Sequence, residues 1–397
     1  MSLNYDVLVA GHICLDIHPD LSGEGRESFK DSFLPGRLVA VGPASCSTGG
    51  AVSNTGLALN RLGIATRLAG KVGDDLFGQA ICQIVAARGP GLADGMIVDP
   101  SASTSYSIII NYPGVDRIFL HYPGANDIFQ AEDVPYRLLG QARLFHFGYP
   151  PIMRSTFVEG GAQLNEIFKR AKRTGVTTSL DMAFPDPSSE AGQADWRSIL
   201  RFVLPQVDIF LPSAEEILFM LRRDTYRELC RQAGGSDILP FITPQLLSDL
   251  GQELLAMGTR MVGLKLGYRG MYLRTHERIL DRSMGRAQPS RPGEWAGEEL
   301  WAPCFKVAVA GTTGAGDATI AGFLGALIRG LPLEQALTLA VAVGACNVEA
   351  ADALSGVRPW DETLARIAAG WGRESLELNA PGWVFDPASG LWRGPCQ

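Results

Sequence analysis

The residues of this chain with the clearest capacity for chemistry are the small residues and the one carboxylate of the segment G-T-T-G-A-G-D, from Gly311 to Asp317. The surrounding pattern predicts that this segment joins an apolar strand at 304–310 to a buried helix at 318–328. A glycine-rich turn that opens a helix leaves backbone N–H groups free and adds the positive end of the helix dipole, so it favours an anion. A carboxylate beside that anion can accept a proton from an attacking hydroxyl group. The combination indicates phosphoryl transfer to an alcohol.

Asp317 also admits a structural interpretation, because aspartate is a favoured residue at the start of a helix, where it caps free N–H groups. Glycine turns after strands are likewise common without any function. In the catalytic interpretation, the amides of Gly314, Ala315 and Gly316 neutralise charge on the migrating phosphate, and Asp317 is the base. We favour this interpretation because other motifs of the chain agree with it.

The composition fits a globular enzyme with one large domain and an appendage, or with two domains. The chain has 397 residues, of which 46% are hydrophobic and 19% charged, and its net charge is −7. Because Lys and Arg are dispersed, neither nucleic acid nor a membrane surface is expected as a partner. No apolar run is long enough to span a bilayer, and no signal peptide is recognisable. Seven scattered cysteines without a C-x-x-C pair predict reduced thiols in a cytoplasmic protein and no zinc site.

The order of the predicted elements indicates an α/β fold class. Short apolar strands alternate with helices, which predicts a mostly parallel sheet with helices on both faces. Ligands of such sheets bind beyond the carboxyl ends of the strands. The predicted strands are 5–10, 65–73, 144–147, 177–181, 209–211, 261–267 and 304–310, and the predicted helices are 50–62, 76–87, 156–174, 195–204 and 318–328.

Three segments depart from this alternation. A hairpin is predicted at 105–111 and 117–121, and it could form a small β layer over the site together with residues 32–41. Residues 283–299 are rich in Gly, Pro, Arg and Glu, which predicts an exposed loop. The segment beyond Gly370 has no clear periodicity, and the sequence does not place it.

Several short motifs, found in the same order, resemble the ribokinase-like, or PfkB, family of sugar and nucleoside kinases. The similarity covers roughly residues 4–360, and it is specific because the motifs occur together. They are G-H-I-C-L-D ending at Asp16, G-G-A-V-S-N from Gly49 to Asn54, V-G-D-D-L-F-G at 72–78, Y-P-G-A-N at 122–126, K-L-G-Y-R-G from Lys265 to Gly270, and G-A-G-D ending at Asp317.

The resemblance implies a ribokinase-like fold, with a mostly parallel sheet flanked by helices and a small β lid. Residues 1–370 would form the kinase domain, with the lid drawn from about 28–45 and 103–124, and 371–397 would be an extension of unknown role. The implied activity is ATP-dependent phosphorylation of a hydroxyl group on a sugar or sugar-like molecule. ATP and Mg²⁺ are the implied cofactors.

The resemblance also implies roles for individual residues, in addition to the base Asp317 and its anion-binding turn. Glu216 would help to hold magnesium through water. The acceptor would contact Asp16, Gly49, Gly50 and Asn54, and the nucleotide would contact Lys265, Gly267, Gly270, Thr313 and Asn347.

Several of these residues have structural alternatives. Lys265 could be a strand-end lysine whose ammonium group reaches solvent, which we favour from the local pattern. Glu216 could be a solvated helix carboxylate. Asn54 could form a local backbone hydrogen bond, and His12 and His146 could be packed neutral histidines.

Two positions depart from the family pattern. The family usually has Asp at the position of Gly311 and Asn at the position of Ser213. Magnesium usually keeps several waters and takes part of its shell from substrate phosphates, so one retained carboxylate, that of Glu216, can suffice. The departures leave metal affinity and dependence on a monovalent cation open.

Other functions remain as alternatives. The acceptor could be a nucleoside, with Phe119, Phe147 or Tyr149 stacking on its base. Gly311 and Ser213 favour a non-catalytic ligand-binding protein with a kinase fold, whereas the intact G-A-G-D segment opposes it. A dinucleotide-dependent oxidoreductase and a Walker-type NTPase are disfavoured because their glycine motifs are missing.

The predicted hairpin also bears on assembly. It carries Ile108, Ile110, Ile118 and Leu120, and a two-stranded hairpin is marginal unless its apolar side chains are covered. An apolar face left exposed commonly marks an interface. Several members of the resembled family dimerise through their β lids, so a homodimer centred on the hairpin is predicted. The alternative is that extra segments of the chain itself cover this face.

Overall fold

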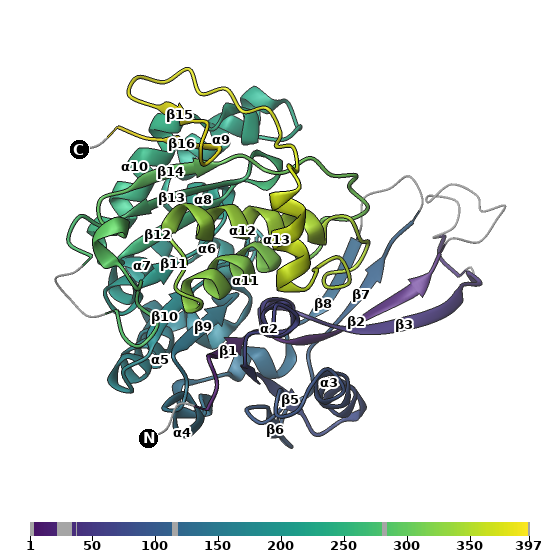
Figure 1. Ribbon diagram of the computed structural model, residues 1–397. Coiled ribbons are helices and arrows are strands. Elements are labelled where there is room, and N and C mark those ends of the chain that lie inside the picture. The colour runs from purple at the N-terminus through teal and green to yellow at the C-terminus, as the bar shows by residue number, and fades with distance from the viewer. Residues whose placement is uncertain (1–3, 22–33, 37, 113–117, 280–283, 396–397) are drawn as a thin grey trace.

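The computed structural model describes residues 4–21, 34–36, 38–112, 118–279 and 284–395. A ten-stranded sheet forms its centre (Figure 1). The strands are β1 (Val7–Gly11), β4 (Thr66–Ala69), β9 (Leu144–Gly148), β10 (Thr177–Leu180), β11 (Ile209–Phe210), β12 (Met261–Lys265), β13 (Met271–Thr275), β14 (Glu299–Ala302), β15 (Val384–Asp386) and β16 (Leu391–Arg393). Their order is β15-β16-β14-β13-β12-β11-β10-β9-β1-β4. The strands from β12 to β4 are parallel and the others antiparallel, so the mostly parallel sheet is confirmed.

Helices cover both faces of this sheet. One face packs against α5 (Ala162–Arg173), α7 (Trp196–Val203), α8 (Ala214–Leu221) and α10 (Pro244–Ala256), and the other against α2 (Ala51–Arg61), α11 (Ala315–Ile328) and α12 (Leu333–Asn347). The remaining helices are α3 (Leu76–Ala86), α4 (Tyr136–Leu139), α6 (Glu190–Gln193), α9 (Arg223–Ala233) and α13 (Trp360–Ala368). In the described part of the chain, no helix is both long and apolar enough to cross a membrane.

The central strands and the two helices beside the glycine turn are buried on all sides. Every residue of β1 and β9 is buried, which explains their continuous apolar sequences. Most residues of α11 and α12 are buried as well, because these helices pack on each other and on the sheet. From Asp317 onward, α11 is therefore held in place by packing on both sides, whereas Ala315 and Gly316 at its start are partly exposed.

A separate four-stranded sheet forms the lid, and Figure 1 shows it projecting from the body. Its strands are β2 (Cys14–Asp20), β3 (Gly42–Gly49), β7 (Tyr106–Ile110) and β8 (Ile118–Tyr122), in the order β3-β2-β7-β8. The predicted hairpin is thus confirmed as β7 and β8, which pair antiparallel.

The expected contribution of residues 32–41 to the lid is wrong where the structure describes them. Residues 34–36 and 38–41 form no strand, and Pro35 and Gly36 make a turn instead. The lid strand begins only at Gly42, and residues 22–33 and 37 lie outside the described residues. Cys14–Asp20, which follows the first strand along the chain, forms the lid strand β2 between β3 and β7. This strand was not predicted from the sequence.

Three element predictions need correction. Residues 304–310 form no strand, apart from a single bridge at Phe305; the strand of this region is Glu299–Ala302, which lies between β13 and β16. The predicted strand 65–73 is interrupted at Gly70, because Lys71–Gly73 (β5) pairs with Ile97–Asp99 (β6) in another sheet. The described part of 283–299 is not a wholly exposed loop, since Trp295 is buried against the core.

The carboxy-terminal segment, which the sequence did not place, extends the large sheet. Strand β16 pairs antiparallel with β14, and β15 pairs with β16. Trp383 packs against Trp301 with ring centroids 6.3 Å apart, so apolar contacts reinforce the strand pairing. In Figure 1 these strands lie at the edge of the body beside β14.

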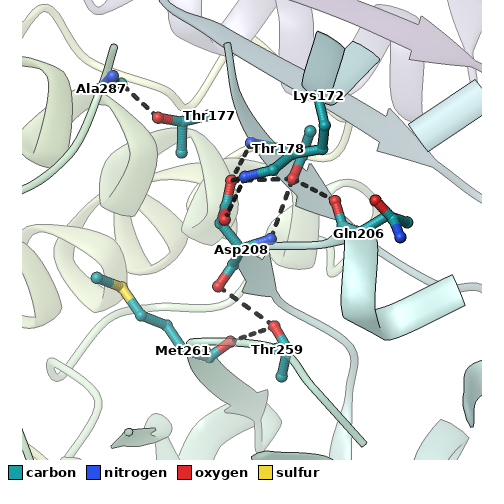
Figure 2. A network of polar contacts seen from close by, with 8 residues as sticks. All are labelled: Lys172, Thr177, Thr178, Gln206, Asp208, Thr259, Met261 and Ala287. Atoms are coloured by element: carbon teal, nitrogen blue, oxygen red, sulfur yellow. Dashed lines mark hydrogen bonds and ion pairs between the residues drawn. The ribbon is translucent and has the colours of Figure 1, made fainter. Parts of the chain in front are cut away.

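A polar network ties together the amino-terminal ends of β10, β11 and β12 (Figure 2). The Lys172 Nζ atom lies 2.7 and 2.8 Å from the Asp208 carboxylate oxygens. The backbone N–H and the hydroxyl of Thr178 donate to Asp208 Oδ2 at 2.9 and 3.0 Å. Burial raises the pKa of Asp208, and the neighbouring Lys172 opposes that rise. This network lies at the end of the sheet opposite to the carboxyl ends of the strands, where ligands are expected.

The Asp208 network is expected to contribute stability and no catalysis. Asp208→Asn removes the charge that pairs with Lys172, so we expect a loss of about 2 kcal/mol in the free energy of unfolding. Urea unfolding measures this loss. An unchanged unfolding midpoint would show that the network does not stabilise the fold.

The outer strand of the lid leaves large apolar side chains in solvent. Phe119, Leu120 and Tyr122 of β8 are all exposed. The homodimer through the lid therefore remains our prediction, because such a face gains free energy when a second copy covers it. Light scattering at micromolar concentration is expected to give twice the 42.6 kDa mass of one chain. A mass equal to one chain would contradict the dimer.

Candidate active site

The glycine turn forms the start of α11 and places Asp317 in its first turn. Gly314 is the N-cap residue and has a φ of 72°, a left-handed conformation that glycine adopts without strain. Asp317 is only 3% exposed, and its carboxylate accepts hydrogen bonds from three side chains outside α11. The capping alternative is therefore wrong in this structure, because Gly314 occupies the cap position and the Asp317 carboxylate points elsewhere.

Three side chains hold the Asp317 carboxylate. From α2, which packs against α11, Thr55 Oγ1 donates to Oδ1 at 3.0 Å and Asn54 Nδ2 donates to Oδ2 at 3.1 Å. The Tyr149 hydroxyl donates to Oδ2 at 2.6 Å. These three hydrogen bonds fix the orientation of the Asp317 carboxylate.

A cavity of about 710 Å³ opens beside this carboxylate. The glycine turn forms one wall through Gly314, Ala315 and Gly316, together with Asp317. The segment before the turn lines another part of the cavity with Phe305, Val307 and Val309. These alternating apolar residues resemble a strand in sequence, but they line the cavity, and their single bridge, between Phe305 and Arg373, lies outside the sheets. An apolar wall next to amide donors suits a nucleotide, whose base is apolar and whose phosphates are anionic.

Lys265 lies at the carboxyl end of β12 and carries the positive charge of this cavity. Its Nζ atom lies 2.5 Å from Asp181 Oδ1, and the Lys265 side chain is 13% exposed. The alternative of a lysine that reaches solvent is therefore wrong. A Cβ atom built on Gly316 would lie 3.7 Å from Lys265 Nζ, so the ammonium group stands directly beside the turn.

Three carboxylates surround this one ammonium group. Burial lowers the pKa of Lys265, but the charges of Asp181, Glu216 and Asp317 outweigh it, and the net shift is upward. Burial raises the pKa of Asp181, and the positive charge of Lys265 opposes this rise. The excess of negative charge would favour a divalent cation, and carboxylate oxygens are the ligands that Mg²⁺ prefers.

The departure at Ser213 has a local structural explanation. Ser213 is the N-cap of α8; its hydroxyl accepts from the Glu216 N–H at 3.2 Å, and the Glu216 carboxylate accepts from the Ser213 N–H at 2.6 Å. This reciprocal capping box fixes the Glu216 side chain at the cavity wall. Serine therefore still positions the carboxylate.

The departure at Gly311 coincides with a close backbone approach. A Cβ atom at this position would lie 2.9 Å from the Ala351 carbonyl oxygen and 3.0 Å from the Ala351 Cα atom. An aspartate at position 311 would therefore require the neighbouring segment to move. The backbone of Ala351 therefore fills the space that an aspartate side chain at position 311 would need.

The predicted acceptor residues gather where β2 and β3 meet the start of α2. A Cβ atom on Gly49 would lie 2.2 Å from Asp16 Oδ2, so a side chain at position 49 would displace that carboxylate. Gly50 has a φ of 86° and leaves room for His12, whose Nδ1 atom would lie 2.5 Å from an added Cβ. Asn54 follows in α2 and binds Asp317. The structure thus connects this group to the base through Asn54.

His12 is the most unusual polar residue on the acceptor side. It is 2% exposed, and neither ring nitrogen has a hydrogen-bond partner among the residues that the structure describes. Burial lowers its pKa well below the usual range, so the ring is neutral, as the sequence alternative held. A ring nitrogen of His12, Cys14 Sγ and a ring nitrogen of His121 all lie within 4.8 Å of one another. No sequence spacing indicates this group, because His121 comes from the distant lid strand.

The remaining predicted nucleotide contacts are divided between the cavity wall and the layer behind it. Gly267 and Gly270 line the cavity. Asn347 is fully buried, and its Nδ2 atom donates to the Thr313 carbonyl at 2.9 Å, so it supports the turn from behind. A contact of Asn347 or Thr313 with the nucleotide remains a prediction.

Sequence reasoning missed three residues of this site. Asp181 and Tyr149 directly follow β10 and β9, and the carboxyl ends of parallel strands are where ligands bind, so their positions offered a signal. Thr55 offered none, because a threonine in a buried helix is common in proteins without any site. Tyr149 was considered only as an aromatic surface, not as a hydrogen-bond donor to Asp317.

The fold and the site together are those of a phosphotransferase whose acceptor is an alcohol. A model described as pfkB family carbohydrate kinase matches residues 25–360, and the chain therefore belongs to this family. It is 27% identical over 307 residues to fructokinase-1 of Zea mays, covering 75% of this chain and 79% of the relative. It is 26% identical over 334 residues to fructokinase-1 of Oryza sativa subsp. japonica, covering 79% and 87%.

Solved structures show the same fold. A fructokinase from Xylella fastidiosa with bound ATP matches with a TM-score of 0.66 at 20% identity, covering 92% of this chain and 98% of the other. A ribokinase from Arabidopsis thaliana complexed with ribose and ATP matches with a TM-score of 0.65 at 18% identity, covering 92% and 98%. An E. coli protein described as ribokinase II, in complex with ATP and Mg²⁺, matches with a TM-score of 0.64 at 21% identity, covering 92% and 99%.

Proposed function

We propose that this chain transfers the terminal phosphoryl group of ATP to a hydroxyl group of a sugar, with Asp317 as the base. The observation that supports this most is the fixed, cavity-facing Asp317 carboxylate in the first turn of α11, beside the N–H groups of Gly314 and Gly316 in the glycine turn. The plant relatives named fructokinases make a ketohexose the first acceptor to test.

The residues present suit a magnesium–ATP complex. Lys265 and the turn amides offer positive charge to the phosphates, while Asp181 and Glu216 offer carboxylate oxygens to the cation. Bound magnesium would neutralise the charge that develops on the phosphates. Phe305, Val307 and Val309 provide the apolar surface for the adenine base.

The backbone amides of the turn and the side chains around Asp317 have separate roles in the transfer. The N–H groups of Gly314 and Gly316 stabilise negative charge on the migrating group. The expected contribution of the Ala315 N–H is not available in this structure, because that group donates to the Thr312 carbonyl at 3.2 Å. Thr55 and Asn54 orient the Asp317 carboxylate, which accepts the proton of the acceptor hydroxyl as its oxygen bonds to phosphorus. The bond between the phosphorus and the leaving ADP oxygen breaks, and proton transfer of this kind contributes about 10²–10⁴-fold.

An assay of ADP release tests the proposal directly. The full chain is incubated with ATP and Mg²⁺ and a panel of ketohexoses, aldohexoses, pentoses and nucleosides, and the phosphorylated product is identified by ³¹P NMR. We expect sugar-dependent ADP release with formation of a sugar phosphate. ADP release that depends on a nucleoside would show that the acceptor is a nucleoside and that the chemistry is the same. Absence of any phosphorylated product, with ATP binding intact, would favour the non-catalytic alternative.

The acceptor side of the site gives a separate prediction. Asp16 is half-buried in the lid strand β2, and burial raises its pKa. Hydroxyl groups of a bound sugar would donate hydrogen bonds to this carboxylate. Asp16→Ala should raise the KM for the sugar at least about tenfold, because hydrogen bonds to a charged group are lost, and leave the KM for ATP nearly unchanged. Asp224→Ala, at an exposed aspartate of α9, is the control. Equal sugar KM values in both variants would remove Asp16 from the acceptor site.

A further inference from the structure

Tyr149 has an uncommon backbone conformation at the edge of the site. It follows β9 directly and has a φ of 66°; among the described residues only Glu159 shares a positive φ without being glycine. A bulky residue in this region is strained, and such strain persists only where the surroundings hold it in place. Residues of this kind are concentrated at functional sites.

The contacts of Tyr149 show what the conformation achieves. The hydroxyl donates to Asp317 Oδ2 at 2.6 Å, and Tyr149 lines the cavity. The ring lies 6.3 Å from the ring of His12, on the acceptor side. Burial, together with the charges of Asp317 and Asp181, raises the pKa of Tyr149, so the phenol stays protonated and can only donate to the carboxylate.

The phenol occupies the place on the base that faces the cavity. Thr55, which binds Oδ1, is fully buried and lies in α2, on the interior side of Asp317. Oδ2 carries both Asn54 and Tyr149, and of these two only Tyr149 is part of the cavity wall. Tyr149 also borders the acceptor side through His12, so an acceptor hydroxyl that approaches Oδ2 competes with the Tyr149 hydroxyl for this oxygen.

We propose that Tyr149 masks the base in the resting enzyme and that the acceptor's hydroxyl displaces it. This inference rests on the proposed function of Asp317. The phenol takes the position of an acceptor hydroxyl, but it keeps its proton, so no reaction follows. It also keeps water from the same position, and water is the competitor that would turn a sugar kinase into an ATPase. Sugar hydroxyls displace the phenol because they bring further contacts with the lid.

The chemistry of the suppressed reaction is simple. If water occupied the place of the phenol, its oxygen would bond to the terminal phosphorus of ATP while the bond to the ADP oxygen breaks. One proton of the water would pass to Asp317, giving ADP and inorganic phosphate. The reaction differs from sugar phosphorylation only in the nucleophile, so one assay of ADP release measures both.

Tyr149→Phe is the decisive variant, because it keeps the ring and removes only the hydroxyl. We expect acceptor-independent ADP release to rise at least about tenfold and the KM for the sugar to fall, since a hydrogen bond to a charged group no longer competes. Tyr272→Phe is the matched control. The Tyr272 hydroxyl donates to the Glu299 carboxylate at 2.7 Å in a buried part of the sheet away from the cavity, and its removal should change neither value.

Two further variants complete the test. Tyr149→Gly accepts the positive φ without strain and should show the same rise, which covers the case that the phenylalanine variant folds poorly. Combining Tyr149→Phe with Asp317→Asn should abolish the rise, because the hydrolysis depends on the base. Unchanged acceptor-independent ADP release in both single variants would overturn the inference. A fall in sugar turnover without any gain in hydrolysis would overturn it too, and would show that Tyr149 holds Asp317 during transfer.

The proposed function and this inference fail in different ways. If the wild type forms no sugar phosphate and no nucleoside phosphate with any acceptor, the proposed function is wrong. If the wild type phosphorylates a sugar and Tyr149→Phe leaves ADP release without acceptor unchanged, only the masking is wrong.

Discussion

Asp317→Asn is expected to lower kcat by about 10²–10⁴-fold, because the amide cannot accept the proton of the attacking hydroxyl. The binding of ATP should be retained, since the turn amides and Lys265 are unchanged. Single-turnover kinetics and equilibrium titration with ATP measure the two effects separately. Asparagine has nearly the size of aspartate, so the packing of α11 against α2 should survive.

Asp208→Asn is the natural control for this variant. It makes the same chemical change in another buried carboxylate, at the opposite end of the sheet, where the network of Figure 2 holds the strands together. We expect lower stability with normal kcat for Asp208→Asn, and nearly normal stability with low kcat for Asp317→Asn. Near-normal turnover of the Asp317 variant would remove this residue from the mechanism.

Much of the fold could be predicted because the central strands are buried on both faces. The sequences of β1, β9 and β12 are short apolar runs for that reason, and their alternation with helices indicates a parallel sheet. The same rule failed for 304–310, whose apolar residues face a cavity rather than a second layer of the protein. Apolar periodicity reports burial, and a ligand cavity gives the same pattern as a sheet.

The carboxy-terminal strands could not be predicted for a different reason. β15 and β16 are three residues each and lie at the edge of the sheet. A strand of that length shows no period, and its place depends on pairing with β14, which is remote in sequence. Contacts with distant parts of the chain decide whether such segments form strands, and these contacts cannot be inferred from a single sequence.

The site shows the same division between local and distant information. Gly314 to Asp317 could be recognised because the turn and the start of the helix are contiguous. Lys265 and Asp181 come from different strands, and only the order of β12, β11 and β10 in the sheet brings them together. Tyr149 reaches Asp317 in a similar way, across 168 positions of the chain. Partners of a recognised residue are therefore the part of a site that sequence reveals least.

The Lys265–Asp181 pair leads to the second large effect. Lys265→Met should lower kcat/KM for ATP by about 10²-fold, because we propose that the ammonium group beside the glycine turn holds the phosphates. The lost charge also leaves Asp181 and Glu216 facing the phosphates without compensation. Repulsion between these anions adds to the lost hydrogen bond, so Mg²⁺ at higher concentration should restore part of the activity.

Lys172→Met is the matched control, since Lys172 forms the other lysine–aspartate pair with a buried carboxylate, that of Asp208. Both variants remove a partner of such a carboxylate and should lose stability, but only Lys265→Met should lose affinity for ATP. Isothermal titration with ATP and Mg²⁺ at a temperature where both variants are folded separates the two effects. Equal ATP affinities in the two variants would show that Lys265 stabilises the fold alone. A selective loss would instead show that the ammonium group held by Asp181 is positioned for the nucleotide, and that its buried pairing serves binding as well as stability.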